Sequence, residues 1–258
     1  MRFGVCTLPT RPVEALAADW RALDGLGVET IWLPDQLPPR PGLRWLECWT
    51  LLGVLARETS RARIGPLVSP LHLRDPTLLA RAAVTLDEIS GGRAELGVGS
   101  GGRRGLAGFV EQIEAAWSDE ALVPNRAVPL TVGGMAETAL RTAAGHASRW
   151  SSYGGEGVDP EPAAELARRQ NARLDELCAE AGRDPRSLRR SILLGYLYVR
   201  ETPWRSEDAF REVVARWRDA GMDEIVFVHP PHAAMPEGAV EEGLFERLAA
   251  GWVEGFAW

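Results

Sequence analysis

The sequence predicts an α/β fold in which eight strands and eight helices alternate as a (β/α)8, or TIM, barrel. Its length of 258 residues is close to the roughly 250 residues that such a barrel typically needs. Short apolar segments alternate with amphipathic segments along the chain, and no linker or shift in composition interrupts them. Eight alternating units favour a closed barrel over a six-stranded, doubly wound sheet. We therefore expect one barrel domain over residues 1–258.

Turn and cap residues separate the apolar segments in the first half of the chain. The predicted strands there are 2–8, 30–33, 64–68 and 94–98, and the predicted helices are 12–26, 46–58, 75–90 and 106–117. Val13, Leu16 and Trp20 recur at spacings of three and four residues, which is helical periodicity. Asp75 is typical of a helix N-cap, and Pro76 is typical of the first helical position.

The second half of the chain repeats this alternation. Its predicted strands are 130–132, 147–152, 191–199 and 224–228, and its predicted helices are 136–145, 162–181, 206–220 and 240–253. Gly182 and Gly221 follow two of these helices, where glycine commonly ends a helix. The strands thus predicted place eight loops at one end of the barrel, the end at which such barrels carry their functional residues.

Composition excludes several classes of function. The net charge of −7, with no basic stretch to offset it, argues against a nucleic-acid partner. Cys6, Cys48 and Cys178 are far apart, which predicts a reduced, cytoplasmic protein without a zinc site. No segment approaches the roughly 20 apolar residues of a membrane span. The chain has no lysine, so its 29 lysine-or-arginine positions are all arginine. This excludes lysine Schiff-base chemistry. Arginine, hydroxyl and backbone N–H groups are left to bind anions.

Gly97, Gly99 and Gly102 have the spacing of a dinucleotide-binding fingerprint. That fingerprint belongs in the first βαβ unit and needs an acidic residue at the end of the next strand. Here the glycines follow the fourth predicted strand, and Asp119 and Glu120 directly follow a helix instead. The context therefore favours a glycine-rich strand end in another α/β fold over a Rossmann phosphate loop.

Three stretches together resemble the bacterial luciferase-like monooxygenase family of flavin- and F420-dependent oxidoreductases. They are "ETIWLPDQL" (29–37), "SRARIGPLVSPLHLRDPTLLARAAVTLDEISGGRAELGVGSGG" (60–102) and "VPLTVGGMAETALRTAAGHASRW" (128–150). The resemblance implies a barrel that binds F420 or FMN, acts on a small organic substrate and forms a homodimer through its early helices. The connection 99–129 between strands four and five is shorter than in typical relatives. The chain thus resembles a shortened member of the family.

The resemblance also implies where the site residues lie. Asp35 and Gln36 stand where the family has an Asp-His pair, and His229 ends the eighth strand; these three are the candidate catalytic residues. The candidate cofactor-binding residues are Leu67, Val68, Ser69, Gly99, Ser100, Gly101, Gly133, Gly134, Met135 and Arg103. The family often has a cis peptide at the Leu67–Ser69 bend. Asp35 could instead be a helix or loop cap, and the glycines could form plain loops or tight turns.

Two features separate the possible cofactors and functions. Gly133 and Gly134 open a helix, whose free N–H groups attract phosphate. Arg103 and Arg104 could hold the acidic tail of F420, which favours F420, with FMN as the alternative. A flavin-binding protein that has lost catalysis and a metal-dependent barrel hydrolase are the other candidate functions. No metal site is expected, because three converging ligands are needed and His229 and His232 have few partners.

Overall fold

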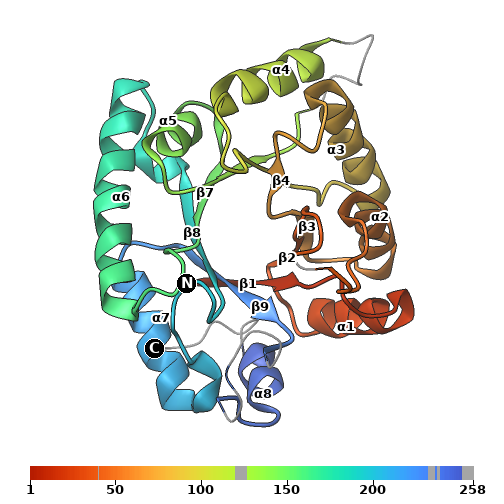
Figure 1. Ribbon diagram of the computed structural model, residues 1–258, viewed down its shortest axis with the longest axis vertical. Helices are drawn as coiled ribbons and strands as arrows, with labels where there is room; N and C mark the ends of the chain where they lie inside the picture. Colours follow the sequence, from red (N-terminus) through yellow and green to blue (C-terminus); the bar gives the residue numbers. More distant parts are fainter. Residues whose placement is uncertain (40, 120–126, 232–235, 237–238, 252–258) are drawn as a thin grey trace.

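All the described strands belong to one parallel sheet that curls into a barrel (Figure 1). The computed structural model describes residues 1–39, 41–119, 127–231, 236 and 239–251. The strands are β1 (Arg2–Thr7), β2 (Thr30–Leu33), β3 (Arg63–Pro66), β4 (Ser69–Pro70), β5 (Leu96–Gly99), β6 (Leu130–Gly133), β7 (Arg149–Ser152), β8 (Arg189–Leu194) and β9 (Glu224–His229). Their order in the sheet is β3-β2-β1-β9-β8-β7-β6-β5-β4.

The helices follow the strands in turn and form the outer layer of the barrel (Figure 1). They are α1 (Val13–Gly25), α2 (Cys48–Glu58), α3 (Pro76–Ser90), α4 (Leu106–Ser118), α5 (Glu137–His146), α6 (Pro160–Glu180), α7 (Glu207–Asp219) and α8 (Leu244–Ala250). The barrel closes where β3 meets the segment before β5: the Ile64 N–H donates to the Arg93 carbonyl at 3.0 Å, and the Glu95 N–H donates to the Ile64 carbonyl at 2.9 Å. The predicted TIM barrel is confirmed.

The structure corrects three predicted boundaries. The third strand, expected over 64–68, is divided into β3 and β4, and the Leu67–Val68 peptide bond between them is cis, as the resemblance implied. The strand expected over 191–199 ends at Leu194, because the chain turns at Gly195, whose carbonyl accepts from the Tyr198 N–H at 2.8 Å. The last helix, expected over 240–253, spans only Leu244–Ala250, and the end of the expected range lies outside the described residues.

Local chemistry explains how α3 is placed. The carboxylate of Asp75 accepts from the Leu78 N–H at 2.9 Å, and Pro76 occupies the first helical position. Gly91 then ends the helix in the left-handed conformation, with φ of 71°, which glycine adopts without steric cost. These are the cap and stop predicted from the sequence, and they fix the direction in which the chain approaches β5.

A buried charged layer fills the barrel below its functional end. Arg149, at 1% exposure, pairs with Glu95 at 3.4 Å and with Glu224 at 3.2 Å. Thr131 donates to Glu95 at 2.6 Å, and Thr30 donates to Glu224 at 2.7 Å. Burial raises the pKa of Glu224, and the nearby Arg149 opposes that shift. Opposite charges thus offset the cost of burying these groups, although the Arg149 guanidinium nitrogens and Glu224 Oε2 have no hydrogen-bond partner among the described residues.

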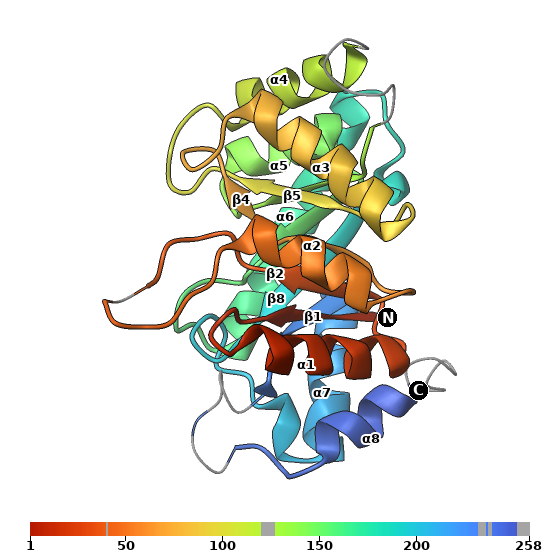
Figure 2. The same cartoon turned by 90° about the vertical axis from the view of Figure 1, so that its right-hand side faces the viewer.

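An apolar layer separates these charges from the open end of the barrel. It consists of Cys6, Trp32, Leu67 and Val226, with Val68 and Leu193 packed against it. The loop between β2 and α2 projects past this end of the barrel (Figure 2). Among the residues that the structure describes, none of the helices has the length and apolar character that crossing a membrane requires.

Candidate active site

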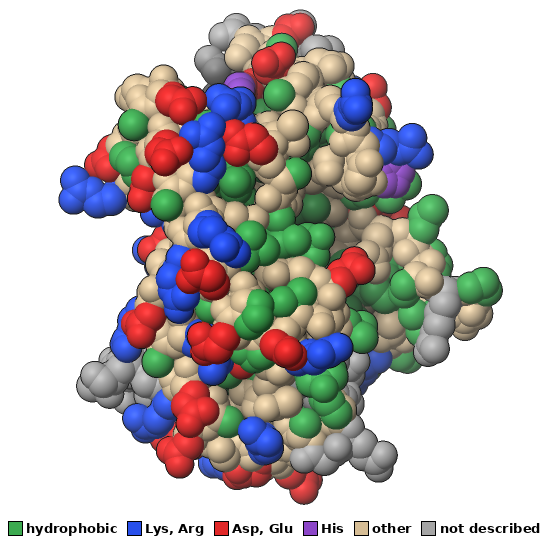
Figure 3. All heavy atoms as spheres, turned by 60° about the vertical axis from the view of Figure 1, so that its left-hand side comes forward, with side chains coloured by type: hydrophobic (Ala, Val, Ile, Leu, Met, Phe, Trp, Pro, Cys, Tyr) green, Lys and Arg blue, Asp and Glu red, His purple; other side chains and the backbone are tan. Residues whose placement is uncertain are grey.

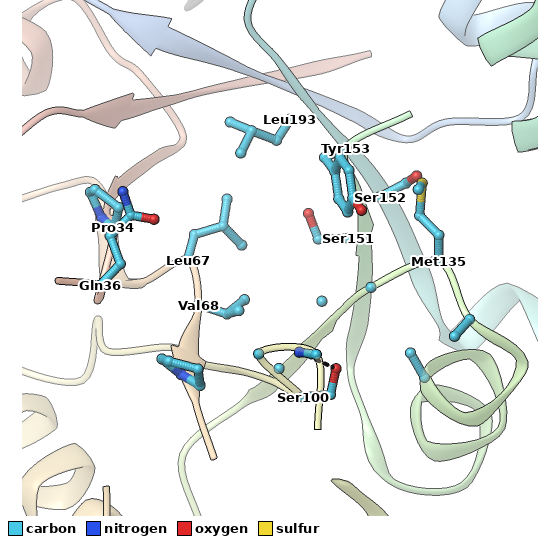
Figure 4. Close-up of a pocket in the computed structure, with 18 of the residues that line it drawn as sticks. Pro34, Gln36, Leu67, Val68, Ser100, Met135, Ser151, Ser152, Tyr153 and Leu193 are labelled. Carbon is cyan, nitrogen blue, oxygen red and sulfur yellow. Dashed lines mark hydrogen bonds between the residues drawn. The ribbon is translucent and has the colours of Figure 1, made fainter. Parts of the chain in front are cut away.

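A cavity of about 940 Å³ opens at the carboxyl ends of the strands, where barrels of this kind carry their sites. The predicted site residues that line it are Asp35, Gln36, Leu67, Val68, Gly99, Ser100, Gly101, Gly133, Gly134 and Met135. In Figure 4, Leu67 and Val68 lie on one side of the cavity, and Tyr153, Ser151 and Met135 lie on the other. Segments far apart in the sequence thus meet around one space.

Three predicted residues lie elsewhere. The Ser69 side chain is fully buried behind the cavity wall, where its hydroxyl donates to Asp35 at 2.6 Å. Arg103 lines a neighbouring cavity instead. The ring of His229 lies 5.0 Å from the ring of Phe245 in α8, and His229 is not among the residues that line the main cavity. A direct part for His229 in the reaction therefore stays a prediction from the sequence.

Asp35 is held by four hydrogen bonds that fix the end of β2. Arg74 donates to its two carboxylate oxygens at 2.6 and 3.0 Å, Ser69 donates at 2.6 Å, and the Trp49 indole N–H donates at 3.2 Å. Asp35 is 4% exposed. The hydrogen bonds that Arg74 donates to Asp35 and to Glu47 raise the pKa of Arg74, against the opposing effect of burial. The carboxylate therefore holds the wall of the cavity in position.

Arg74 connects this ion pair to the start of α2. It also donates to Glu47 at 2.6 Å, and Glu47 caps α2 by accepting from the Trp49 N–H at 3.1 Å and the Thr50 N–H at 2.7 Å. Burial raises the pKa of Glu47, but these hydrogen bonds outweigh it and bring that pKa to about 2. The sequence analysis missed Arg74 and Trp49. The Arg74-Asp75-Pro76 motif within residues 60–102 drew attention to this loop, but it did not show that Asp35 is the partner of Arg74.

The glycines of β5 and β6 make room for the side chain of Val68, which precedes the neighbouring strand β4. A Cβ on Gly99 would lie 2.6 Å from a methyl group of Val68, and one on Gly133 would lie 2.8 Å from the other. A Cβ on Gly97 would come within 3.3 Å of Val68 and would also meet the carbonyl of Pro66. The glycines at these strand ends therefore allow Val68 to enter the barrel, a role that the sequence reading did not anticipate.

The start of α5 opens into the same cavity. The Gly134 N–H donates to the Ser151 carbonyl at 3.0 Å, and the Trp150 indole N–H donates to the Gly134 carbonyl at 2.7 Å, so this turn is fixed from β7. The N-cap residue is Ala136, which has no side-chain group that can cap the helix. Since Met135 and Ala136 line the cavity, the N-terminal N–H groups of α5 and its positive dipole end are directed at a space that a ligand can fill.

Two phenols stand at the cavity. The rings of Tyr153 and Tyr198 are 5.6 Å apart in an edge-to-face arrangement, and both residues line the cavity. Burial, followed by the nearby Cys6 and Glu156, raises the pKa of Tyr198. Its hydroxyl therefore keeps its proton throughout the neutral range and can donate it.

A second cavity, of about 530 Å³, lies beside the first. We call it the arginine cavity; it is lined by Arg103, Arg104, Gly105, Leu106, Ala107, Thr138, Arg141, Thr142 and His146. Thr138 lines both cavities, so the two adjoin at the first turn of α5. Among the described residues, no group of three or more histidine, cysteine or acidic side chains could hold a metal ion; His232 lies outside that set.

Comparison with known proteins agrees with this geometry. The family model described as "Luciferase-like monooxygenase" matches residues 1–110, the part that contributes β1 to β5 and most of the Asp35 wall. Residues 1–110 thus carry the luciferase-like monooxygenase match. An uncharacterized protein of Mycobacterium tuberculosis is 27% identical over 96% of this chain and 99% of its own. That alignment spans 300 positions, more than the 258 residues of this chain, so the relative carries segments that this one lacks.

Two solved structures of F420-dependent enzymes share the fold. The coenzyme F420-dependent tetrahydromethanopterin reductase of Methanopyrus kandleri superposes with a TM-score of 0.73, at 15% identity, over 98% of this chain and 97% of its own. An F420-dependent secondary alcohol dehydrogenase, in complex with an F420-acetone adduct, superposes with a TM-score of 0.75, at 12% identity, over 96% and 98%. At these identities the likeness establishes a common barrel, and the site must be argued from its own residues.

Proposed function

We propose that this luciferase-like protein is an oxidoreductase that uses a reduced flavin-type cofactor, F420 or FMN, to reduce or monooxygenate a small organic substrate. One observation carries the proposal: the N-terminus of α5 opens into a large cavity at the carboxyl ends of the strands. An apolar chamber that ends in an anion-binding helix terminus fits a flat ring system attached to a phosphate. The F420-dependent reductase and the F420-dependent alcohol dehydrogenase that share this fold support the same class of cofactor.

The phosphate fits the start of α5. Gly134 has a φ of 136°, and nothing but the Ala139 methyl lies near the position of a Cβ there, at 3.1 Å. A phosphate can therefore approach the backbone of Met135 and Ala136 closely. The chain has no lysine, so backbone N–H groups and the hydroxyl groups of the cavity are natural phosphate ligands.

Leu67, Val68 and Leu193 would hold the ring of the cofactor, because these side chains form an apolar wall of the cavity. A bound reduced flavin-type cofactor supplies the hydride or the electrons that activate oxygen. The protein binds and orients it and excludes water from the apolar side.

Gln36 carries no proton that it can release at neutral pH, and the Asp35 carboxylate is occupied by Arg74. The Tyr198 phenol lines the cavity beside Tyr153, and we assign to its Oη the proton that the substrate receives.

A cofactor titration tests the proposal. Purified protein is titrated with F420 and with FMN while the tryptophan fluorescence and the visible absorbance are recorded. Tight, saturable binding of one of them is expected, and turnover with the reduced form then separates an enzyme from a cofactor-binding protein. Binding of neither would refute the proposal.

We also propose a homodimer formed through the early helices. Leu78 in α3 is 64% exposed and Ile89 is 41% exposed, which is costly for isolated apolar side chains if they stay in water. Sedimentation equilibrium of the wild-type protein and of Leu78→Glu tests this. A monomeric wild-type protein would contradict the proposal.

A further inference from the structure

Two loops that follow neighbouring strands are joined beside the main cavity. The loop after β7 carries Tyr153 and Glu156, and the loop after β8 carries Tyr198. The Val158 N–H donates to the Tyr198 carbonyl at 3.1 Å, and the Arg200 N–H donates to the Val158 carbonyl at 2.9 Å. Because these backbone hydrogen bonds join the loops, Glu156 and the two tyrosines form one rim of the cavity, which all three side chains line.

Glu156 differs from the other carboxylate that lines the main cavity. That carboxylate, Asp35, is neutralised by Arg74 at 2.6 Å. Glu156 is exposed, and no basic side chain of the described residues lies within salt-bridge distance of it. The arginine of the two joined loops, Arg200, pairs with Asp159 at 3.3 Å. The negative charge of Glu156 is therefore available to a ligand in the cavity.

The outer face of the barrel shows the contrast. Along α6, arginine and acidic side chains alternate over the surface (Figure 3). Glu165 pairs there with Arg168 at 2.9 Å, and Glu176 pairs with Arg173 at 2.7 Å. These carboxylates are neutralised by their neighbours, whereas Glu156, in the loop that leads into α6, has no such neighbour among the described residues.

Tyr153 and Tyr198 add two aromatic rings beside this charge. Their centroids are 5.6 Å apart and their planes are inclined at 61°, so the rings form a corner. Figure 4 shows Tyr153 across the cavity from Leu67. Burial is the main cause of the raised pKa of Tyr198, and the charge of Glu156 adds to it, so this carboxylate acts on the phenol. Aromatic rings and a carboxylate both attract a cation, and an organic ammonium group suits the two together.

We propose that the substrate carries an organic ammonium group, which binds at Glu156 and against the rings of Tyr153 and Tyr198. This inference rests on the proposed function and names the class of substrate that the same site takes. The rest of the substrate is apolar, because Leu37, which is 70% exposed, and Leu73 also line the cavity. The net charge of −7 on the chain favours the approach of a cation as well.

Three probes with one skeleton test the inference. Phenethylammonium, phenethyl alcohol and hydrocinnamate carry a positive, a neutral and a negative end group at neutral pH. Each is titrated by calorimetry, at low and at high salt, into the wild type, Glu156→Gln and Glu212→Gln. Glu212 is exposed on α7 and lines neither cavity, so Glu212→Gln makes the same change in net charge at another place. Circular dichroism checks that the variants are folded.

We expect the wild type to bind phenethylammonium about tenfold more tightly than phenethyl alcohol, because an ion pair and a cation–π contact each add a several-fold preference. Hydrocinnamate should bind more weakly than the alcohol. Glu156→Gln should reduce the preference for the cation to about threefold, the part left to the aromatic rings, without changing the affinity for the alcohol. Glu212→Gln should bind all three probes as the wild type does. High salt should reduce the preference of the wild type, because salt screens exposed charges.

Tyr153 supplies an independent test of the aromatic contact. Tyr153→Phe should keep the preference for phenethylammonium, because phenylalanine retains the ring, whereas Tyr153→Leu should lower it. A wild type that does not bind phenethylammonium, or binds it no better than the alcohol, overturns the inference, as does an undiminished preference in Glu156→Gln. The titrations with F420 and FMN are separate: a protein that binds one of them without preferring the cation keeps the proposed function and loses this inference. A protein that prefers the cation but binds neither cofactor loses the proposed function and keeps the ammonium site.

Discussion

Asp35 and Arg74 form a two-point ion pair between the end of β2 and the loop that leads into α3, with N–O distances of 2.6 and 3.0 Å. The carboxylate is 4% exposed, whereas the Arg74 side chain is 28% exposed. Because the pair joins two walls of the main cavity, its loss would change the shape of the site as well as the stability of the fold. The carboxylate at the position predicted to be catalytic thus has a structural function in this geometry.

Asp35→Ala should therefore lower stability substantially. Removing one partner of a buried, hydrogen-bonded ion pair typically costs about 3 to 5 kcal/mol. The variant also leaves the Ser69 hydroxyl without its acceptor, while the Trp49 indole N–H keeps the Ser69 Oγ as its acceptor. Urea denaturation of wild type and variant measures the difference in the free energy of unfolding. Asp175→Ala, which removes an exposed carboxylate on α6, is the control, with an expected change of less than about 1 kcal/mol. A stable Asp35→Ala that has lost only turnover would restore a catalytic role for Asp35.

Gly133→Ala should destabilise the protein through a clash with Val68. The new methyl group would lie 2.8 Å from a methyl group of Val68, and overpacking of this kind typically costs about 1 to 3 kcal/mol. The double variant Gly133→Ala/Val68→Ala should recover part of that loss, because the two positions are in contact. Gly108→Ala in α4 has no atom within 4 Å of the new Cβ and should be stabilising by up to about 1 kcal/mol. Thermal melts of these three variants and of Val68→Ala decide the matter, and strictly additive effects of Gly133→Ala and Val68→Ala would refute the contact.

The pH dependence of stability should reveal the buried Glu224. Its pKa in the folded protein is raised above the ordinary value of 4.5, so the folded state holds this proton more tightly than the unfolded state does. The contribution of Glu224 to stability is then full below about pH 4.5 and decreases as the pH rises through the folded pKa. The free energy of unfolding of wild type minus that of Glu224→Gln should therefore decrease from pH 4 towards neutrality. A difference that grows with pH would mean that the folded pKa is lowered.

Tyr198→Phe tests the proton donor. Loss of a general acid typically lowers the rate by about a hundredfold or more, and the cofactor contacts proposed at α5 do not involve this hydroxyl. We expect kcat to fall to that extent while the Kd for the cofactor stays unchanged. Tyr196→Phe, two residues earlier in the same loop and not at the cavity, should keep full activity. Equal rates for Tyr198→Phe and wild type would exclude Tyr198 as the donor.

The sequence predicted the barrel because alternation and capping are local properties. Asp75, Pro76 and Gly91 mark the ends of α3 within a few residues of the chain. The cavity could also be predicted in outline, since parallel strands place their carboxyl ends together. The residues named at those ends, such as Val68, Gly99 and Gly133, do surround one space.

The partners within the site could not be predicted in the same way. Arg74 and Asp35 are 39 positions apart, and many of the arginines in this chain could equally have reached that carboxylate. Likewise, the sequence alone does not distinguish a strand-end glycine that a ligand approaches from one that a valine methyl group approaches. Only the arrangement of β3 and β4 shows that Val68 fills the space above Gly99 and Gly133. His229 illustrates the reverse case, since its strand end is where expected but its ring lies against Phe245.

Ala136→Asp should separate cofactor binding from folding, because it is expected to raise the stability of the fold and to lower the affinity for the cofactor. Ala136 is the exposed N-cap residue of α5 and has no capping side chain, so an aspartate there should cap the helix and raise the free energy of unfolding by about 0.5 to 2 kcal/mol. The same carboxylate would occupy the N–H groups proposed to bind the cofactor phosphate and would repel it.

Affinity for F420 or FMN should therefore fall at least tenfold, which corresponds to about 1.4 kcal/mol, in a protein that melts at a higher temperature. Ala136→Ser is the matched control, since it caps the helix without adding a negative charge and should cost less affinity. Gly134→Asp is a weaker test, because the φ of 136° at Gly134 would strain any other residue. If Ala136→Asp is more stable and binds the cofactor as tightly as the wild type does, the phosphate does not bind at α5, and the N-terminus of α4 beside Arg103 becomes the site to test.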